Sequence, residues 1–338
     1  MSRAAATTPP SAAPAWLPLL PVLAIYGGLF ALGLFVPDMR QLAAKLAFYC
    51  ALAQAFNVFM GLTGYVDFGY VAFVGIGAYG MAVCLNQAET LGLTAVPLGL
   101  FTGIAASCLL ALAVGAVALR LRGAYFAIAT VGVNEGLRYL ILGLRLFGGS
   151  QGMIYIGKLT KVYGRQGMVA LTTFWADTFV FLIAASAAAA TLLCMRSRLG
   201  YALRALRSDE DAARAVGVNV TAAKIAAFLL SAVMAGALGA VAWGLKDGYV
   251  YPATAFEVHY TVEAIIIVLI GGAGTLQGPV VGGLVYGLLK HLLSIYIGTY
   301  QLLLFAPLLI AVIIFFPEGL MGYLLARLRT TRLGPWIL

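Results

Sequence analysis

A chain of 338 residues that is 63% hydrophobic and only 10% charged is not an ordinary soluble domain, in which about 25% of residues are charged. Several apolar runs reach the roughly 20 residues that an α-helix needs to cross a bilayer, and the 40 glycines suit closely packed membrane helices better than a β-barrel. The net charge of +9 fits arginine-rich loops on one side of a membrane and does not require a nucleic-acid partner.

The first half of the chain alternates apolar runs with short polar connections. Residues 1–15 form an Ala-, Thr- and Pro-rich lead that we expect to be disordered and cytoplasmic. The apolar runs predict membrane spans over residues 16–36, 46–60, 94–119 and 123–144, with a polar connection at 40–45 between the first two.

A glycine-rich stretch, GLTGYVDFGYVAFVGIGAYG, follows the second span at Gly61–Gly80. In a helix interior each glycine costs about 1 kcal/mol relative to alanine. We therefore expect residues 61–69 to form a bend or a broken helix, and a helix to resume over residues 70–85.

The span at 123–144 carries two charges, Glu135 and Arg138, at i, i+3 spacing. They can neutralise each other on one helical face, and charged groups at membrane depth should face protein or water. We favour a packed intramembrane charge pair, and a role in a transport pathway or gate is the alternative.

The longest highly charged stretch, residues 196–224, lies between the apolar runs 172–195 and 225–245. It predicts a helix of about 8 residues that is capped by Ser208 and stopped by Gly217. Three acidic residues would fill its first turn, where they suit the helix dipole: Asp209, Glu210 and Asp211. Its small residues would let another protein approach the backbone: Ala212, Ala213, Ala215 and Val216. The alternative is a solvated cytoplasmic loop with one helical turn.

The second half contains another glycine-rich interruption, GGAGTLQGP, within the apolar run 263–289. Paired interrupted segments in the two halves of a membrane protein indicate a transport site between structural repeats. The residues we predict along a translocation path lie in or near the two interruptions: Gln54, Asn57, Thr63, Gly64, Gly272, Gly274 and Thr275. For Gln54 and Asn57 a packing role is an equal alternative.

Counting basic residues places 196–224 and both termini in the cytoplasm and makes 147–173 the longest loop on the other side. With a last span at 301–316, the sequence predicts an all-α polytopic membrane protein with about nine to ten transmembrane helices and two glycine-rich broken segments. The permease domain would cover residues 16–322, followed by a basic cytoplasmic tail at 323–338.

No catalytic or metal-binding pattern is found. The four cysteines lie apart in apolar runs without a CxxC pair, and the two histidines lack the spacing of metal ligands. Gly152, Gly157 and Lys158 match G-x-x-x-x-G-K, but Leu159 replaces the Ser or Thr that would bind magnesium. We expect no nucleotide site, no metal site and no cofactor on this chain.

Several motifs together resemble one protein family. They are RLRGAYFAIATVGVNEGLRYL at 120–140, SRLGYALRALRSDEDAARAVGVNV at 197–220, LIGGAGTLQGPVVGG at 269–283 and FFPEGL at 315–320. In this order they are similar to branched-chain amino-acid ABC transporter permeases of the LivM type. The family's ATPase-contacting pattern matches Asp211, Ala212, Ala213 and Gly217.

The resemblance implies an inner-membrane heterodimer with a second permease of the LivH type. It also implies two cytoplasmic ATPase subunits, which would bind the ATP, and a periplasmic substrate-binding protein. The transported solute would be a branched-chain amino acid or another small polar solute, such as urea, a short amide or an aromatic acid. The alternative is an ion-coupled secondary transporter in which Glu135 or Asp67 titrates. A channel would need a selectivity loop, and none is recognisable.

Overall fold

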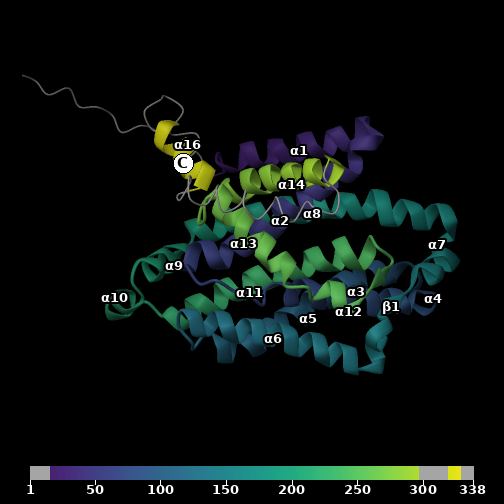
Figure 1. The fold of residues 1–338 in the computed structure, drawn as a ribbon, viewed down its shortest axis with the longest axis horizontal. Coiled ribbons are helices and arrows are strands. Elements are labelled where there is room, and N and C mark those ends of the chain that lie inside the picture. Colours follow the sequence, from purple (N-terminus) through teal and green to yellow (C-terminus); the bar gives the residue numbers. More distant parts are fainter. Residues whose placement is uncertain (1–15, 297–318, 329–338) are drawn as a thin grey trace, which may run out of the picture.

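The structure, a computed structural model, describes residues 16–296 and 319–328 and consists almost entirely of helices (Figure 1). Six helical stretches of this part are long and apolar enough to cross a membrane, and two shorter apolar helices accompany them. The predicted class, a helical polytopic membrane protein, is thereby confirmed. The 1–15 lead, the 301–316 span and most of the basic tail lie outside the described residues, so the predicted domain boundaries stay predictions.

The helices before the charged stretch are α1 (Leu19–Phe35), α2 (Arg40–Thr63), α3 (Val71–Asn86), α4 (Ala88–Leu91), α5 (Ala95–Ala118), α6 (Ala124–Gly143), α7 (Ile156–Ala170) and α8 (Ala176–Arg196). The later helices are α9 (Arg198–Ser208), α10 (Glu210–Ala215), α11 (Val220–Gly239), α12 (Pro252–Ala255), α13 (His259–Gly271), α14 (Gly278–Tyr296) and α16 (Gly319–Leu328). A π-helical turn, Ala240–Leu245, prolongs α11, and a second one, Leu171–Trp175, joins α7 to α8.

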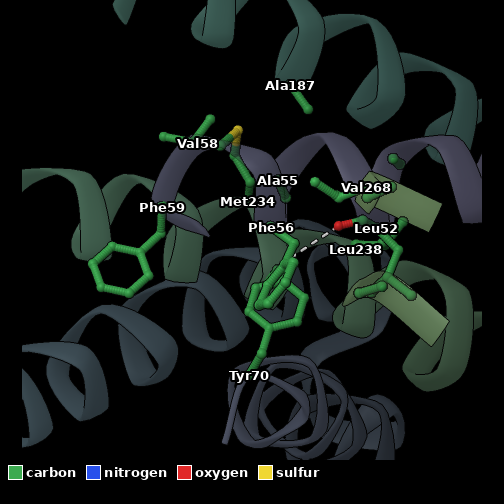
Figure 2. Close-up of a cluster of buried hydrophobic side chains, with 14 of the residues drawn as sticks. Leu52, Ala55, Phe56, Val58, Phe59, Tyr70, Ala187, Met234, Leu238 and Val268 are labelled. Atoms are coloured by element: carbon green, nitrogen blue, oxygen red, sulfur yellow. Dashed lines mark hydrogen bonds between the residues drawn. The ribbon is translucent and has the colours of Figure 1, made fainter. Parts of the chain in front are cut away.

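Helix α2 forms the centre of the core and is the most completely buried of the candidate spans, with 89% of its apolar window inside the protein. Figure 2 shows Phe56 and Phe59 of α2 among side chains from α8, α11 and α13. The Tyr70 ring lies 4.7 Å from that of Phe56, and its hydroxyl donates to the Leu52 carbonyl at 3.3 Å. In the second half of α2 the polar residues Gln54, Asn57 and Thr63 are buried and therefore face protein and not lipid.

Glycines let α3 pack closely against its neighbours α5 and α11. A Cβ atom on Gly77 would lie 2.2 Å from the Gly236 carbonyl oxygen of α11, and one on Gly80 would lie 2.5 Å from Gly103 of α5. No real side chain tolerates such contacts. Small residues at helix crossings are the usual means of bringing membrane helices together.

Neither α3 nor α13 is long enough to cross a bilayer alone, although α13 together with α12 (Pro252–Gly271) is one of the six candidate spans. Their 16 and 13 residues span about 24 and 20 Å, against a hydrocarbon core of about 30 Å. Their first turns meet, because the Val71 amide donates to the Thr261 hydroxyl at 3.0 Å. From this junction α13 runs toward α9, and α3 runs toward α4 and α7 at the opposite end of the molecule (Figure 1).

Two predicted polar connections are helical. Residues 40–45 form the first turns of α2, where Arg40 binds Asp177 of α8 at 3.2 Å. The predicted loop 147–173 contains α7, whose Leu159 is fully buried while most of the rest of the helix is exposed. The sequence did not reveal that these two connections are helical, because an amphipathic or charged helix has no long apolar run. The structure also contains a short antiparallel pair, β1 (Met153–Ile154) with β2 (Tyr249–Val250), which the sequence did not predict.

Candidate functional site

The charged stretch forms two consecutive short helices, α9 and α10, at one end of the molecule (Figure 1). Residues 198–215 are called the α9–α10 hairpin below. The N-cap of α10 is Asp209, whose carboxylate accepts hydrogen bonds from the Asp211 and Ala212 amides at 2.9 and 3.0 Å. The prediction that Ser208 caps this helix is wrong. Ser208 ends α9, and its hydroxyl donates to the Arg204 carbonyl. Asp209 takes the capping role because its backbone is extended, which points its side chain at the free amides.

Gly217 ends α10 in the left-handed conformation that we predicted, with φ at +90°. The Gly217 amide donates to the Arg214 carbonyl, and the Val218 amide donates to the Ala213 carbonyl. This pair of bonds satisfies the last carbonyls of α10 in a Schellman motif. The helix contains 6 residues, Glu210–Ala215, and is shorter than predicted.

The small residues of α10 divide into an inner and an outer set. Ala213 is 3% exposed and packs against Leu206 and Val220 of the same chain, so it cannot offer itself to another protein. Ala212 and Val216 are exposed. The exposed face of α10 that an outside partner could contact is therefore formed by Ala212, Ala215 and Val216, without Ala213.

Glu210 connects α10 to the membrane domain through Lys224 and Tyr65. Its Oε2 accepts from the Lys224 Nζ of α11 at 2.8 Å and from the Tyr65 hydroxyl at 2.5 Å. Its Oε1 binds Arg214 at 2.9 Å. The Lys224 side chain is only 2% exposed, and its ammonium also lies 4.0 Å from the centre of the Tyr65 ring. Sequence reasoning did not find this arrangement, because its members lie far apart along the chain.

These contacts set the ionisation of Glu210. Partial burial alone would raise the pKa of its carboxyl. The hydrogen bonds from Lys224 and Tyr65, with the charges of Lys224 and Arg122, outweigh burial and lower the pKa below its ordinary value. Glu210 is therefore ionised at neutral pH and holds the α10 helix against Tyr65.

The first glycine-rich stretch is non-helical over residues 64–70. Gly61 and Thr63 still belong to α2, and Gly64 ends the helix with φ at +78°. The Thr63 hydroxyl donates to the Phe59 carbonyl at 2.7 Å and accepts from the Tyr65 amide at 3.1 Å. In the second stretch, residues 272–277 separate α13 from α14, and Gly272 has φ at +114°.

The two glycine-rich stretches lie against each other. The Asn57 side chain donates to the Thr275 carbonyl at 2.9 Å and accepts from the Gly274 amide at 2.8 Å. A Cβ atom on Gly61 would lie 2.6 Å from the Gly274 nitrogen, so the absence of a side chain permits the contact. Two broken segments that share one transport site are expected to lie close together, and this proximity is confirmed. The hydrogen bonds by which Asn57 joins the end of α2 to the second stretch were not predicted.

Gln54, one turn before Asn57 on α2, is fully buried. Within the described part of the chain neither polar atom of its side-chain amide has a hydrogen-bond partner. A buried amide without partners is unusual and is a natural position for an internal water.

Glu135 and Arg138 form the ion pair that their spacing predicts, with 3.4 Å between Arg138 Nη1 and Glu135 Oε2. About a third of each side chain is exposed. The neighbouring Asn134 is fully buried and donates to the Phe256 carbonyl at 3.0 Å. The geometry of the pair is therefore confirmed, whereas its role stays a prediction.

Glu263 of α13 is a buried carboxylate that the sequence did not single out. Its side chain is 1% exposed, binds Lys290 of α14 and lies 2.8 Å from His259 Nε2. The i, i+4 spacing of His259 and Glu263 was the available signal. Lys290 of this cluster lines a cavity of about 380 Å³ together with Trp243 and Tyr260. Among residues 16–296 and 319–328, no three His, Cys, Asp or Glu side chains are arranged to hold a metal.

Comparison with known proteins supplies the family. The family model for the branched-chain amino acid transport system permease component matches residues 39–315. The chain is 31% identical to the LivM permease protein of the Salmonella typhimurium high-affinity branched-chain amino acid transport system, over 83% of this chain and 69% of that protein.

More distant relatives belong to the same class. The BraD permease protein of Pseudomonas aeruginosa and the LivH permease protein of Escherichia coli are each 25% identical to the chain, over 81% of it and 91% of their own lengths. No solved structure is significantly similar to the chain. The comparisons give no support to an ion-coupled secondary transporter.

The apolar helices, the polar α9–α10 hairpin and these similarities lead to one assignment. The relatives are permease subunits and not enzymes, and ATP hydrolysis in such importers belongs to separate subunits. The chain belongs to the family of branched-chain amino-acid transport permeases, the multi-pass membrane subunits of ABC importers.

Proposed function

We propose that this chain carries branched-chain amino acids inward across the bacterial inner membrane by alternating access. The ATP would be bound and hydrolysed by two cytoplasmic ATPase subunits, and a periplasmic binding protein would deliver the solute. The permease itself would need no cofactor. The substrate is inferred from the relatives named above, all of which are permease proteins of branched-chain amino acid transport systems.

One observation carries the mechanical part of the proposal. Glu210 of α10 is bound to Tyr65, which lies in the non-helical stretch directly after α2. A subunit that displaces α10 would therefore act on the interrupted part of the membrane domain without an intermediate element. This is what an ATP-driven permease requires of its contact with the ATPase.

The orientation follows from the basic residues at the α9–α10 end. This end would face the cytoplasm, since it carries seven arginines: Arg120, Arg122, Arg196, Arg198, Arg204, Arg207 and Arg214. The exposed face of α10, formed by Ala212, Ala215 and Val216, would contact the ATPase. The predicted contact set from Ser208 to Gly217 is thus reduced, because Ala213 is buried within the chain.

We further propose a heterodimer with a second permease. Escherichia coli has two different permease proteins named for the same transport system, LivM and LivH, and the chain resembles both. Two related subunits can enclose one path between them. The partly exposed pair Glu135–Arg138 favours a protein or water boundary on α6, because lipid would not tolerate these charges.

The translocation path would run past the two broken segments, near Gln54, Asn57, Thr63, Gly64, Gly272, Gly274 and Thr275. Irregular backbone at membrane depth must be buried in protein or line water. Counting α3 and α13 as partial spans and adding the apolar run 301–316 from the sequence, the subunit would have nine to ten membrane helices.

Reconstitution of the complete importer in liposomes tests the function. We expect ATP-dependent uptake of labelled leucine, isoleucine or valine that requires the binding protein and stops with a non-hydrolysable ATP analogue. Urea, a short amide and an aromatic acid serve as competing solutes. Efficient uptake of one of these without uptake of leucine would overturn the substrate, and uptake without ATPase subunits would overturn the mechanism.

A further inference from the structure

Arg207 lies in the last turn of α9 and joins both broken segments. Its Nη1 donates to the Gly61 carbonyl in the last turn of α2 at 2.5 Å. The same nitrogen lies 3.4 Å from the carbonyl of Ala273, just beyond the end of α13. One guanidinium therefore contacts the ends of two membrane helices that are distant in the sequence.

The chemistry of these helix ends suits an arginine. The last carbonyls of a helix have no partner within it and carry partial negative charge, so a cation placed there is favourable. Hydrogen bonds from a charged donor are about twice as strong as neutral ones. No carboxylate of the described residues forms an ion pair with Arg207, whereas nearby Arg122 and Arg214 both bind Glu210. The contacts found for the Arg207 head group are thus to backbone carbonyls.

Glycines leave the space that the arginine occupies. A Cβ atom on Gly274 would lie 2.5 Å from Arg207 Nη1, and one on Gly64 would lie 3.4 Å from its Cγ. Gly274 also has φ at +80°, which side chains rarely adopt. Any residue other than glycine at position 274 would displace the guanidinium from the Gly61 carbonyl.

The surroundings of Arg207 permit movement. A cavity of about 510 Å³ lies between residues 63–68 of the first broken segment and residues 206–210 of the α9–α10 hairpin. The cavity leaves room for movement at the α10 end of the hairpin, whereas Leu203 of α9 is fully buried in the main hydrophobic core. Among the polar contacts between the hairpin and the membrane domain, those of Arg207 reach both the end of α2 and the residues just after α13.

We infer that Arg207 is the positioning residue that makes the inner ends of α2 and α13 follow the α9–α10 hairpin when an ATPase displaces it. The inference rests on the proposed function. Arg207 passes the movement of the α9–α10 hairpin, which follows nucleotide binding to the ATPase, on to the two broken segments. Arg207 does not touch the solute. Its role is to keep the two helix ends in a fixed relation to the hairpin.

The experiment compares solute uptake per ATP hydrolysed in the reconstituted importer. Arg207→Ala should lower this ratio at least tenfold while ATP hydrolysis stays within about twofold of wild type. Arg207→Lys, which keeps the charge but has no fork of donors, should give an intermediate ratio. Arg198→Ala is the matched control, since Arg198 is an exposed cation on the same helix with no hydrogen bond to either segment, and its ratio should equal that of wild type.

The outcomes separate the inference from the function on which it rests. If the wild-type importer shows no ATP-dependent uptake, the proposed function is wrong whatever Arg207 does. If the wild type transports and Arg207→Ala has the same ratio, the inference is overturned. Should Arg207→Ala fail to assemble, the Lys variant decides, because a wild-type ratio in it would overturn the inference and a ratio below half of wild type would support it.

Discussion

At the scale of single residues, one carboxylate organises the link between α10 and the membrane helices. Glu210 neutralises Lys224, whose side chain is 2% exposed and would otherwise be a buried unpaired cation. Removing one partner of such a pair costs much more than the pair contributes to stability, because the remaining charge stays buried. Exposed pairs such as Arg122 with Asp211 have no comparable effect.

Glu210→Gln should therefore lower the free energy of unfolding by about 3 kcal/mol, since Lys224 loses its counter-charge. Thermal unfolding of the purified subunit in detergent measures this. Asp211→Asn is the control and should leave the unfolding temperature unchanged. If both substitutions lower the unfolding temperature equally, the charge of Glu210 is not what stabilises the buried Lys224.

The same residue predicts a pH dependence. The pKa of Glu210 is lowered in the folded protein, so its contribution is complete above the ordinary glutamate pKa of about 4.3 and is lost as the pH falls through the lower, folded value. The stability difference between wild type and Glu210→Gln should be constant between about pH 6 and pH 8, because Glu210 is ionised throughout this range in both the folded and the unfolded state. It should shrink below about pH 4. A difference that is already lost near pH 6 would contradict the lowered pKa.

At the scale of elements, α10 presents one face to the chain and another to the outside. Ala212→Trp should prevent assembly with the ATPase while the permease remains folded, because this side chain points outward. Ala213→Trp should instead destabilise the permease itself, because Ala213 packs against Leu206 and Val220. Co-purification with the ATPase and thermal unfolding distinguish the two. Full ATPase assembly of Ala212→Trp would remove this face from the interface.

Helix α6 has the charge pair Glu135–Arg138 at its middle. Replacing either residue alone with alanine should reduce the amount of folded protein in the membrane several-fold, because the other charge is left unpaired. The double variant Glu135→Leu with Arg138→Leu should recover wild-type abundance if the pair serves packing. A double variant that accumulates normally but does not transport would assign the pair to the pathway, and single variants with wild-type abundance would contradict the pairing.

At the scale of the whole molecule, the two broken segments form one junction next to the α9–α10 hairpin. In a background without Cys50, Cys84, Cys108 and Cys194, the variants Thr63→Cys and Thr275→Cys should react with a small maleimide at rates that change when an ATP analogue binds the complex. The junction is joined to α10 through Tyr65 and Glu210, so the two positions should change together. Thiols that stay inert in every state would remove the junction from the transport cycle.

The sequence predicted the parts of this molecule that depend on local pattern. The apolar runs gave α5, α6 and α11 to within a few residues, because uninterrupted apolar length is what a bilayer selects. The amphipathic α7 was missed, since its burial depends on contact with other helices. Likewise, Asn57 and Arg207 act on backbone groups that are far away in the sequence, and no spacing rule announces such contacts.

The meeting of the first turns of α3 and α13 has a consequence for the biogenesis of the protein. Hydroxyl side chains satisfy backbone groups at the start of α3: Thr261 accepts from the Val71 amide, and Thr130 accepts from the Phe68 amide. These partners belong to α6 and α13, which are synthesised after α3. When α3 has just left the ribosome, the Phe68 and Val71 amides therefore have no partner until α6 and α13 have been synthesised. The newly made chain must keep this region in water or in the insertion machinery until α13 has arrived, so membrane insertion and tertiary folding cannot be separate stages for this part of the subunit.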